Sequence, residues 1–277
     1  MRQQFGSKEG MRALRGWFFL SLLAGMMMAS AYGQAAGGVP QPAAAEQLFA
    51  LANQARAEAG VAPLVWDPAL AVAAMRHCQR MAVEGPIAHR YAGELDLTER
   101  AGAAGAHFSL IEENIAVGSH ASTIHTGWME SPGHRTNLLN AQVDHVGIAV
   151  IAAQGVLFAV QDFSKSVDVL TQDQVEARIA ALVKVSGVSV RRDNVDARGA
   201  CRLDRGLPPL RFDQPDFIMR WRGADLDRLP ADLVARLASG QYHQAEVGSC
   251  PGQAAEGPFT VYRVAVLLYD SRPQSGW

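Results

Sequence analysis

The sequence has no marked excess of charge of either sign: 25 lysines and arginines face 27 aspartates and glutamates, which gives a formal net charge of −2. Proteins that bind nucleic acid through its phosphates usually carry a broad basic surface, so nucleic acid is not an expected partner. Cysteine is also scarce, at three residues in 277, and the chain has no internal repeat. With 49% hydrophobic residues, the composition excludes a chain that is disordered throughout and suits one large domain or two small ones.

The N-terminal segment lacks the hydrophobic length of a transmembrane helix. Its apolar run, Trp17 to Met28, is shorter than the about 20 residues that span a bilayer. Basic residues precede the run and small residues follow it: Arg2, Lys8, Arg12 and Arg15, then Ala29-Ser30-Ala31. This layout predicts a secretory signal peptide over residues 1–31, with an uncleaved anchor as the alternative. We therefore expect a secreted or periplasmic protein without stable membrane insertion after signal removal.

The three cysteines are interpretable in an exported protein, because oxidising compartments permit disulfides. Cys201 and Cys250 lie in the same C-terminal region. A bond between them would close a loop of about 50 residues and stabilise the protein by about 4 kcal/mol. Cys78 shares a face of an expected helix with Leu70 and Met81, so we expect it to be a buried core residue.

The N-terminal half alternates between helical and extended patterns. A Gly/Pro/Ala-rich stretch predicts a flexible leader over residues 32–45. Asp67 followed by Pro68 predicts the start of a helix, since this is an N-cap residue before a first-turn proline. Helices are expected over 48–59, 68–85, 94–104 and 121–130, with extended segments over 109–117, 146–152 and 156–162. The pattern indicates helices flanking a small antiparallel sheet, an α+β architecture.

A second unit is expected over residues 168–277. Thr171 and Gln174 have the spacing of a capping box at the start of a helix. Further on, the sequence predicts a strand over 217–221, a helix over 230–240 and a final run over 259–269 that is apolar on both faces, as in a central strand. We expect a small α+β accessory domain, whose function the sequence does not indicate.

Histidine is concentrated in the first unit, where seven of the eight lie between residues 77 and 145. His89 follows a Gly-Pro turn, and His134 lies in the segment Trp128-Met129-Glu130-Ser131-Pro132-Gly133-His134-Arg135. Between them, Glu112-Glu113-Asn114-Ile115-Ala116 opens an extended segment. A polar site is therefore expected in this unit.

Four ordered segments resemble the CAP domain, also called the SCP-like extracellular domain, of the cysteine-rich secretory protein, antigen 5 and pathogenesis-related family. They are Asn53-Gln54-Ala55-Arg56 through Trp66-Asp67, residues 81–89, Glu113-Asn114-Ile115-Ala116, and residues 128–139 with Val146-Gly147-Ile148. The resemblance covers about residues 48–164 and is to the bacterial form of the domain.

The resemblance implies an α-β-α sandwich over residues 46–165 with a cleft lined by His89, Glu113 and His134. Glu130 is the candidate for a fourth cleft position, although it follows Trp128 by two residues where the family usually has three. The family association also implies a lipid or sterol, or an extracellular protein, as the partner class.

Two imidazoles and a carboxylate also suit a divalent cation such as Zn²⁺, with His89 and His134 as the candidate ligands. No HExxH segment presents a ready-spaced ligand pair, so the chain does not indicate tight zinc binding. We expect a binding module rather than an enzyme. The alternatives are a metal-assisted hydrolase of a peptide or cell-envelope substrate, with Glu113 as the candidate base, and a structural envelope protein with a vestigial cleft.

Overall fold

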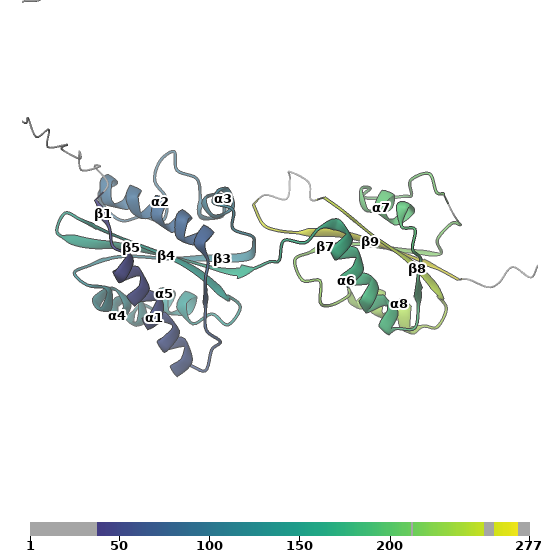
Figure 1. The fold of residues 1–277 in the computed structure, drawn as a ribbon, viewed down its shortest axis with the longest axis horizontal. Helices are drawn as coiled ribbons and strands as arrows, with labels where there is room; N and C mark the ends of the chain where they lie inside the picture. The colour runs from purple at the N-terminus through teal and green to yellow at the C-terminus, as the bar shows by residue number, and fades with distance from the viewer. Residues whose placement is uncertain (1–37, 212, 252–257, 271–277) are drawn as a thin grey trace, which may run out of the picture. The chain divides into compact units, whose positions relative to one another are not determined.

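The computed structural model describes residues 38–211, 213–251 and 258–270. The predicted signal peptide and the predicted leader up to residue 37 lie outside the described residues. Figure 1 shows two sheets, each covered by helices, from successive parts of the chain. Within the described ranges, no helix is both long and apolar enough to cross a membrane.

The first sheet has the strand order β1-β4-β5-β3, with β2 paired to β4. The long strands β3 (Phe108–Gly118), β4 (His145–Ala153) and β5 (Val156–Ser166) pair antiparallel. The short strands are β1 (Val39–Pro40) and β2 (Val65–Trp66). The expected hairpin is confirmed between β4 and β5, with Gln154 and Gly155 at positive φ in its turn. Because β3 ends the strand order, one of its edges is unpaired within the described sheet.

Helices cover both faces of this sheet. Helices α1 (Pro42–Glu58), α4 (Ala121–Glu130) and α5 (Pro132–Leu138) pack on one face, and α2 (Pro68–Glu84) and α3 (Leu97–Ala103) lie on the other. Alternate residues of β4 supply the two cores, with Ile148 and Val150 on the α1 face and Ala149 and Ile151 on the α2 face. The expected α-β-α sandwich is therefore observed.

Local sequence signals explain where the helices begin. The Asp67 side chain accepts hydrogen bonds from the backbone N–H groups of Ala69 and Leu70, as predicted for the N-cap of α2. Asp96 and Glu99 form a capping box that starts α3 at Leu97, later than the expected residue 94. The leader prediction is wrong from residue 38 onward. Val39 pairs with β4, and Pro42 starts a helix in which Ala45 is already buried, because proline suits a first helical turn and alanine favours helix.

Arg56, at the end of α1, is fully buried and ties three segments together. Its guanidinium donates to backbone oxygens of Ala62 (2.7 Å), Leu138 (3.0 Å), Asn140 (3.0 Å) and Val143 (3.0 Å). Burial lowers the pKa of Arg56, because the charged form loses hydration. The four carbonyl acceptors compensate for part of that loss.

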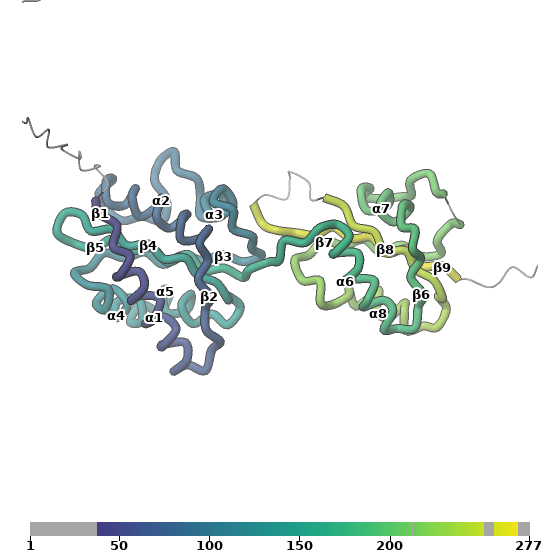
Figure 2. The backbone as a smooth tube through the Cα atoms, in the orientation of Figure 1, coloured from purple at the N-terminus to yellow at the C-terminus, as the bar shows by residue number. Residues whose placement is uncertain are grey.

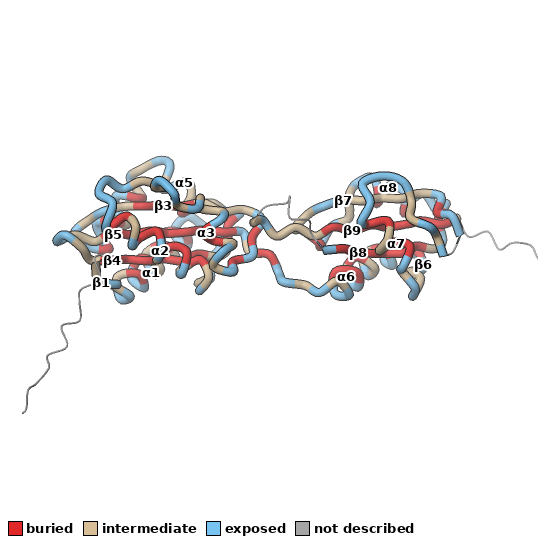
Figure 3. Tube along the Cα trace, turned by 90° about the horizontal axis from the view of Figure 1, so that it is seen from above, coloured by how far each residue is buried: buried red, intermediate tan, exposed pale blue. Residues whose placement is uncertain are grey.

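The second sheet has the order β6-β8-β9-β7. Its strands are β6 (Ser189–Val190), β7 (Phe217–Gly223), β8 (Gln244–Cys250) and β9 (Tyr262–Tyr269). The final apolar segment is central, as expected, since β9 pairs with both β7 and β8. Figure 2 follows the chain through both sheets, and Figure 3 shows the buried residues concentrated along their middle strands.

Helices also lie on both faces of the second sheet. Helices α6 (Gln172–Val185) and α8 (Ala231–Ala238) pack on one face, and α7 (Val195–Cys201) packs on the other. The predicted Thr171–Gln174 capping box starts α6. The predicted Cys201–Cys250 disulfide is present and joins α7 to β8, while Cys78 is buried and unpaired, as expected. Sequence patterns missed α7 and β8.

In each sheet a glycine lets a helix backbone approach a strand. A Cβ atom built on Gly147 of β4 would lie 2.0 Å from the Ala71 nitrogen of α2, and one built on Gly248 of β8 would lie 2.3 Å from the Arg198 nitrogen of α7. Both distances are too short for nonbonded atoms. Each strand therefore needs a glycine at this position for the helix to pack where it does.

Gly147→Ala should therefore destabilise the protein by about 3 kcal/mol, because α2 must move away from the sheet. Gly127→Ala is the matched control: a Cβ there meets nothing within 4 Å, and alanine favours a helix such as α4. Thermal and urea unfolding followed by circular dichroism would measure both changes. Equal stability of the two variants would contradict the close-approach argument.

Candidate functional site

Glu113 lies in the middle of β3, and its side chain is buried, with 3% of its surface exposed. It faces the α2 and α3 side of the sheet, where His77 and Arg100 lie next to it. The adjacent residue, Asn114, is also buried and reaches α5: its Nδ2 donates to the backbone oxygen of His134 (3.1 Å). Neighbouring residues of β3 thus connect the site to helices on both faces of the sheet.

Both oxygens of the Glu113 carboxylate have a nitrogen donor. His89 Nδ1 lies 2.7 Å from Oε1, and a guanidinium nitrogen of Arg100 pairs with Oε2. Arg100 also donates to the backbone oxygen of His89 (3.2 Å), so it holds the loop as well as the carboxylate. Removing one member of such a buried pair costs about 3–5 kcal/mol, because the other charge is left without compensation.

Glu94 and His77 form a second buried acid–base pair next to Glu113. His77 Nδ1 is 2.8 Å from Glu94 Oε1, and its Nε2 is 3.9 Å from Glu113 Oε2. The His77 side chain is fully buried in the packed face of α2. Burial alone would raise the pKa of Glu94, but the hydrogen bonds from His77 and from the Tyr91 backbone, together with the charges of His77 and Arg100, lower it below its usual value.

Asp162 of β5 lies directly across from Glu113 in the strand pairing. It is fully buried, and no donor among the described residues reaches either carboxylate oxygen. Burial, and then the nearby charge of Glu113, raise the pKa of Asp162 well above its usual range. Both effects favour the protonated form of Asp162.

The two cleft histidines differ in their environment. The His89 side chain is 60% exposed, and its hydrogen bond to Glu113 raises its pKa above the ordinary value. The pKa of His134 is lowered, first by burial and then by the positive charge of His89. At a pH between the two values, His89 is positively charged and His134 is neutral.

The structure pairs His89 with Glu113 and places His134 on α5, near enough for the charge of His89 to lower its pKa, whereas Glu130 contacts none of them. Glu130 is exposed at the last residue of α4, with no hydrogen bond or ion pair to any other described residue. Arg100 and Asp162 belong to the site and were not expected from the sequence. The capping box at Asp96 could have placed Arg100 in the short helix, whereas Asp162 is recognisable only once β3 and β5 are paired.

Imidazole nitrogens are ligands that divalent cations such as Zn²⁺ accept. The Glu113 contact engages Nδ1 of His89 and directs the ring, as carboxylates do for metal-binding histidines, and leaves Nε2 as the ligand atom. His134 would be the second ligand. In the part of the chain that the structure describes, no group of three or more His, Cys, Asp or Glu side chains is placed to hold a metal. Solvent or a bound ligand would have to complete the coordination.

The family model matches the part of the chain that forms most of the first sheet and its helices. Residues 49–163 match the model of the CAP, or cysteine-rich secretory protein, family. An uncharacterized membrane protein of Bacillus subtilis, YlbC, is 32% identical over 113 residues, which are 40% of this chain and 32% of that protein. The chain thus spans about a third of the length of this curated relative.

Two solved structures are also similar over about half of the chain. An extracellular protein containing an SCP domain from Bacillus anthracis is 30% identical, with a TM-score of 0.42 over 46% of this chain and 41% of that one. An outer surface protein of Borrelia burgdorferi is 20% identical, with a TM-score of 0.44 over 47% of this chain and 98% of that one.

The fold and the cleft residues define an α-β-α sandwich with a His/Glu site beside β3. Together with the family match, they identify residues 49–163 as a domain of the CAP type. The resemblance drawn from the sequence is confirmed.

His89 should titrate above the ordinary histidine pKa, and Glu113→Gln should lower its pKa, because the hydrogen-bonded carboxylate favours the charged ring. A higher pKa in the folded state also means that this pair stabilises the fold at low pH and that the contribution is lost as pH rises through that value. NMR titration of the imidazole signals measures both effects.

Glu130→Gln is the matched control and should leave His89 unchanged, since Glu130 is not at the site. Circular dichroism would show that each variant is folded. An ordinary pKa for His89 in the parent protein, or the same shift in both variants, would contradict the assigned contact.

Proposed function

We propose that this protein is exported and that its CAP domain is a binding module whose ligand site is formed by His89, Glu113 and His134. The observation that carries the proposal is that a donor engages each oxygen of Glu113. A carboxylate held by Arg100 and His89 is suited to orienting a ligand-binding imidazole. To act as a general base on water, it would first have to release one of these donors.

Export is supported by three independent features. The N-terminal layout is that of a signal peptide, although residues 1–31 lie outside the described part of the structure. The disulfide between Cys201 and Cys250 suits an oxidising compartment. A similar solved protein from Bacillus anthracis is named as extracellular. In this proposal, residues 46–165 bind the ligand and residues 168–277 form an accessory domain.

A divalent cation is the proposed ligand, because the imidazole nitrogens of His89 and His134 are suitable donor atoms for it. His89 and His134 would bind it weakly, and the ion would supply a Lewis acid to which an anionic group of a larger ligand could attach. A lipid or sterol, or an extracellular protein, remains the proposed class of larger partner. Metal-assisted hydrolysis and a purely structural envelope role are the competing hypotheses.

Calorimetric titration of zinc, and separately of calcium and magnesium, into residues 32–277 at about pH 7.5 tests the metal proposal. The fragment of residues 32–277 contains every helix and strand that the structure describes. We expect saturable one-site zinc binding, weakened at least tenfold in His89→Ala/His134→Ala because both proposed ligands are removed. His120→Ala/His243→Ala is the control, since it removes two exposed imidazoles outside the cleft.

Equal zinc binding by the parent and the folded cleft variant would refute the metal site and direct the search to lipid and protein ligands. Turnover of a peptide or envelope substrate that disappears with chelator and in Glu113→Gln would instead favour the hydrolase. If the cleft substitutions change stability alone, the structural role is supported.

A further inference from the structure

The outer edge of β4 in the first sheet is covered at its two ends and open between them. At one end β1 pairs with β4, and the Gln41 N–H donates to the Val150 oxygen (2.8 Å). At the other end β2 pairs with β4, and the Asp67 N–H donates to the Val146 oxygen (2.9 Å). Helices α1 and α2 follow these short strands and lie on opposite faces of the sheet (Figure 1). The stretch of β4 from Val146 to Val150 is about 13 Å long, at about 3.3 Å per residue.

Ile148 lies in the middle of this open stretch. Backbone groups two residues apart in a strand point to the same edge, so the N–H and C=O of Ile148 face outward, as the oxygens of Val146 and Val150 do. Neither β1 nor β2 pairs with Ile148, and no other described residue forms a hydrogen bond with these two groups. Only 3% of Ile148 is exposed. Buried backbone groups almost always have a partner, so this donor and acceptor are positioned to bind one.

A pocket opens beside Ile148. It has a volume of about 260 Å³ and is lined by residues 148–150 of β4 and by the N-terminal halves of α1 and α2. Most of its other lining side chains are apolar, namely Pro40, Pro42, Ala45, Trp66, Ala71 and Met75. Small-molecule pockets usually measure about 300–1,000 Å³, so this one suits a single large side chain better than a whole cofactor.

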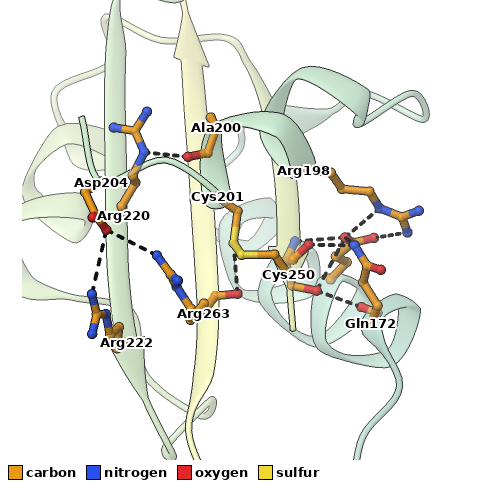
Figure 4. Close-up of a disulfide and its surroundings, with 11 residues drawn as sticks. Gln172, Arg198, Ala200, Cys201, Asp204, Arg220, Arg222, Cys250 and Arg263 are labelled. Carbon is orange, nitrogen blue, oxygen red and sulfur yellow. Dashed lines mark hydrogen bonds and ion pairs between the residues drawn. A yellow bond between two sulfur atoms is a disulfide. The ribbon is translucent and has the colours of Figure 1, made fainter. Parts of the chain in front are cut away.

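Side chains complete the hydrogen bonding of backbone groups in other parts of the protein. Figure 4 shows one case beside the C-terminal disulfide, where Arg220 Nε donates to the backbone oxygen of Ala200 (2.7 Å). The side-chain amide of Gln41 lines the pocket beside Ile148, but its Nε2 donates to the backbone oxygen of Val39 (3.3 Å). The two backbone groups of Ile148 therefore stay available to a ligand.

Glu46 is the charged residue that lines the pocket. Its side chain is exposed on α1, and no other described residue forms an ion pair or hydrogen bond with its carboxylate. A ligand with a basic group next to its apolar part would complement this charge. Three exposed valines are next in sequence to residues that line the pocket: Val39, Val65 and Val72. Exposed apolar residues gathered around a pocket are typical of protein interaction sites.

We propose that this edge pocket binds a short extended segment of a partner protein, in which an apolar residue is flanked by basic ones. In an antiparallel pair, one residue exchanges both of its hydrogen bonds with the residue opposite, so a single peptide residue satisfies the N–H and the C=O of Ile148. Its side chain enters the pocket, and a basic neighbour faces Glu46. An acyl chain would fill the same space but leave Ile148 without hydrogen bonds.

The length of the opening limits what binds there. About 13 Å of strand, bounded by Gln41 and Asp67, admits about three extended residues. The backbone bonds supply affinity and the pocket selects the side chain, as in other cases of peptide addition to a sheet edge. The pocket shares no residue with the cleft of His89 and His134, so this inference is independent of the proposed metal site.

NMR titration of ¹⁵N-labelled residues 32–277 with the blocked tripeptide acetyl-Lys-Leu-Lys-amide tests the proposal. We expect a saturable shift of the Ile148 amide signal, because its N–H gains an acceptor. Methylation of the leucine nitrogen in the peptide should weaken binding about tenfold, since the donor to the Ile148 oxygen is lost. A peptide with glutamate in place of both lysines should also bind more weakly, because it meets the charge of Glu46.

Two pairs of variants locate the bound peptide. Ala71→Leu should weaken binding at least tenfold, because the larger side chain fills the pocket. Ala57→Leu is its control, at an exposed position of α1 that does not line the pocket. Glu46→Gln should weaken binding of the lysine peptide about threefold, as expected for an exposed ion pair, whereas Glu58→Gln on the same helix should not. Circular dichroism would show that each variant is folded.

His89→Ala/His134→Ala should bind the peptide as the parent does, which separates this site from the cleft. The proposal is overturned if the parent does not bind the peptide, if the N-methylated peptide binds equally well, or if Ala57→Leu and Ala71→Leu weaken binding equally. Binding of decanoate without the peptide would assign the pocket to an acyl chain. A dimer that light scattering detects and Ala71→Leu dissociates would assign it to a second copy of the chain, and either result contradicts the proposal.

Discussion

A carboxylate taken out of water must be neutralised by its neighbours, and the Glu113 carboxylate imposes this requirement on the whole of its site. Arg100 brings in α3, His89 brings in the loop after α2, and burial together with the charge of Glu113 raises the pKa of Asp162, which favours its protonated form. The orientation of the exposed His89 imidazole is therefore set by buried groups around Glu113 that a ligand would not contact. This dependence explains why so many buried polar groups surround a single exposed imidazole.

Arg56 is the corresponding case for a positive charge. This buried cation is surrounded by backbone carbonyls from the turns around it. Both residues come from segments by which the sequence resembles the CAP family, yet their roles differ. Arg56 fixes α1 to the loops that follow α1 and α5, whereas Glu113 governs the ionisation of the cleft.

Sequence patterns predicted those parts of the fold whose signals are local. The Asp67 N-cap, the β4–β5 hairpin, the Thr171 capping box and the pairing of Cys201 with Cys250 all depend on residue type and spacing along the chain. The N-terminal end of α1 was missed because a Pro/Ala-rich composition is shared by linkers and by helix starts. Asp162 was missed for a different reason: it becomes a partner of Glu113 only through strand pairing. Family resemblance identified His89, Glu113 and His134, but it also suggested Glu130, which the structure places at an exposed helix end.

The unpaired cysteine has a consequence for biosynthesis. Burial raises the pKa of Cys78 to about 12, so in the folded protein its thiol is almost never ionised and does not react. In an unfolded chain emerging into an oxidising compartment, however, it is as reactive as the other two cysteines. Cys78 precedes them by more than a hundred residues of sequence, so in the proposed export, which starts from the N-terminus, it would emerge first. If the α-β-α sandwich folds before the last strands of the chain emerge, Cys78 is already buried and cannot take part in disulfide exchange. The order in which the cysteines emerge would then protect the pairing of Cys201 with Cys250.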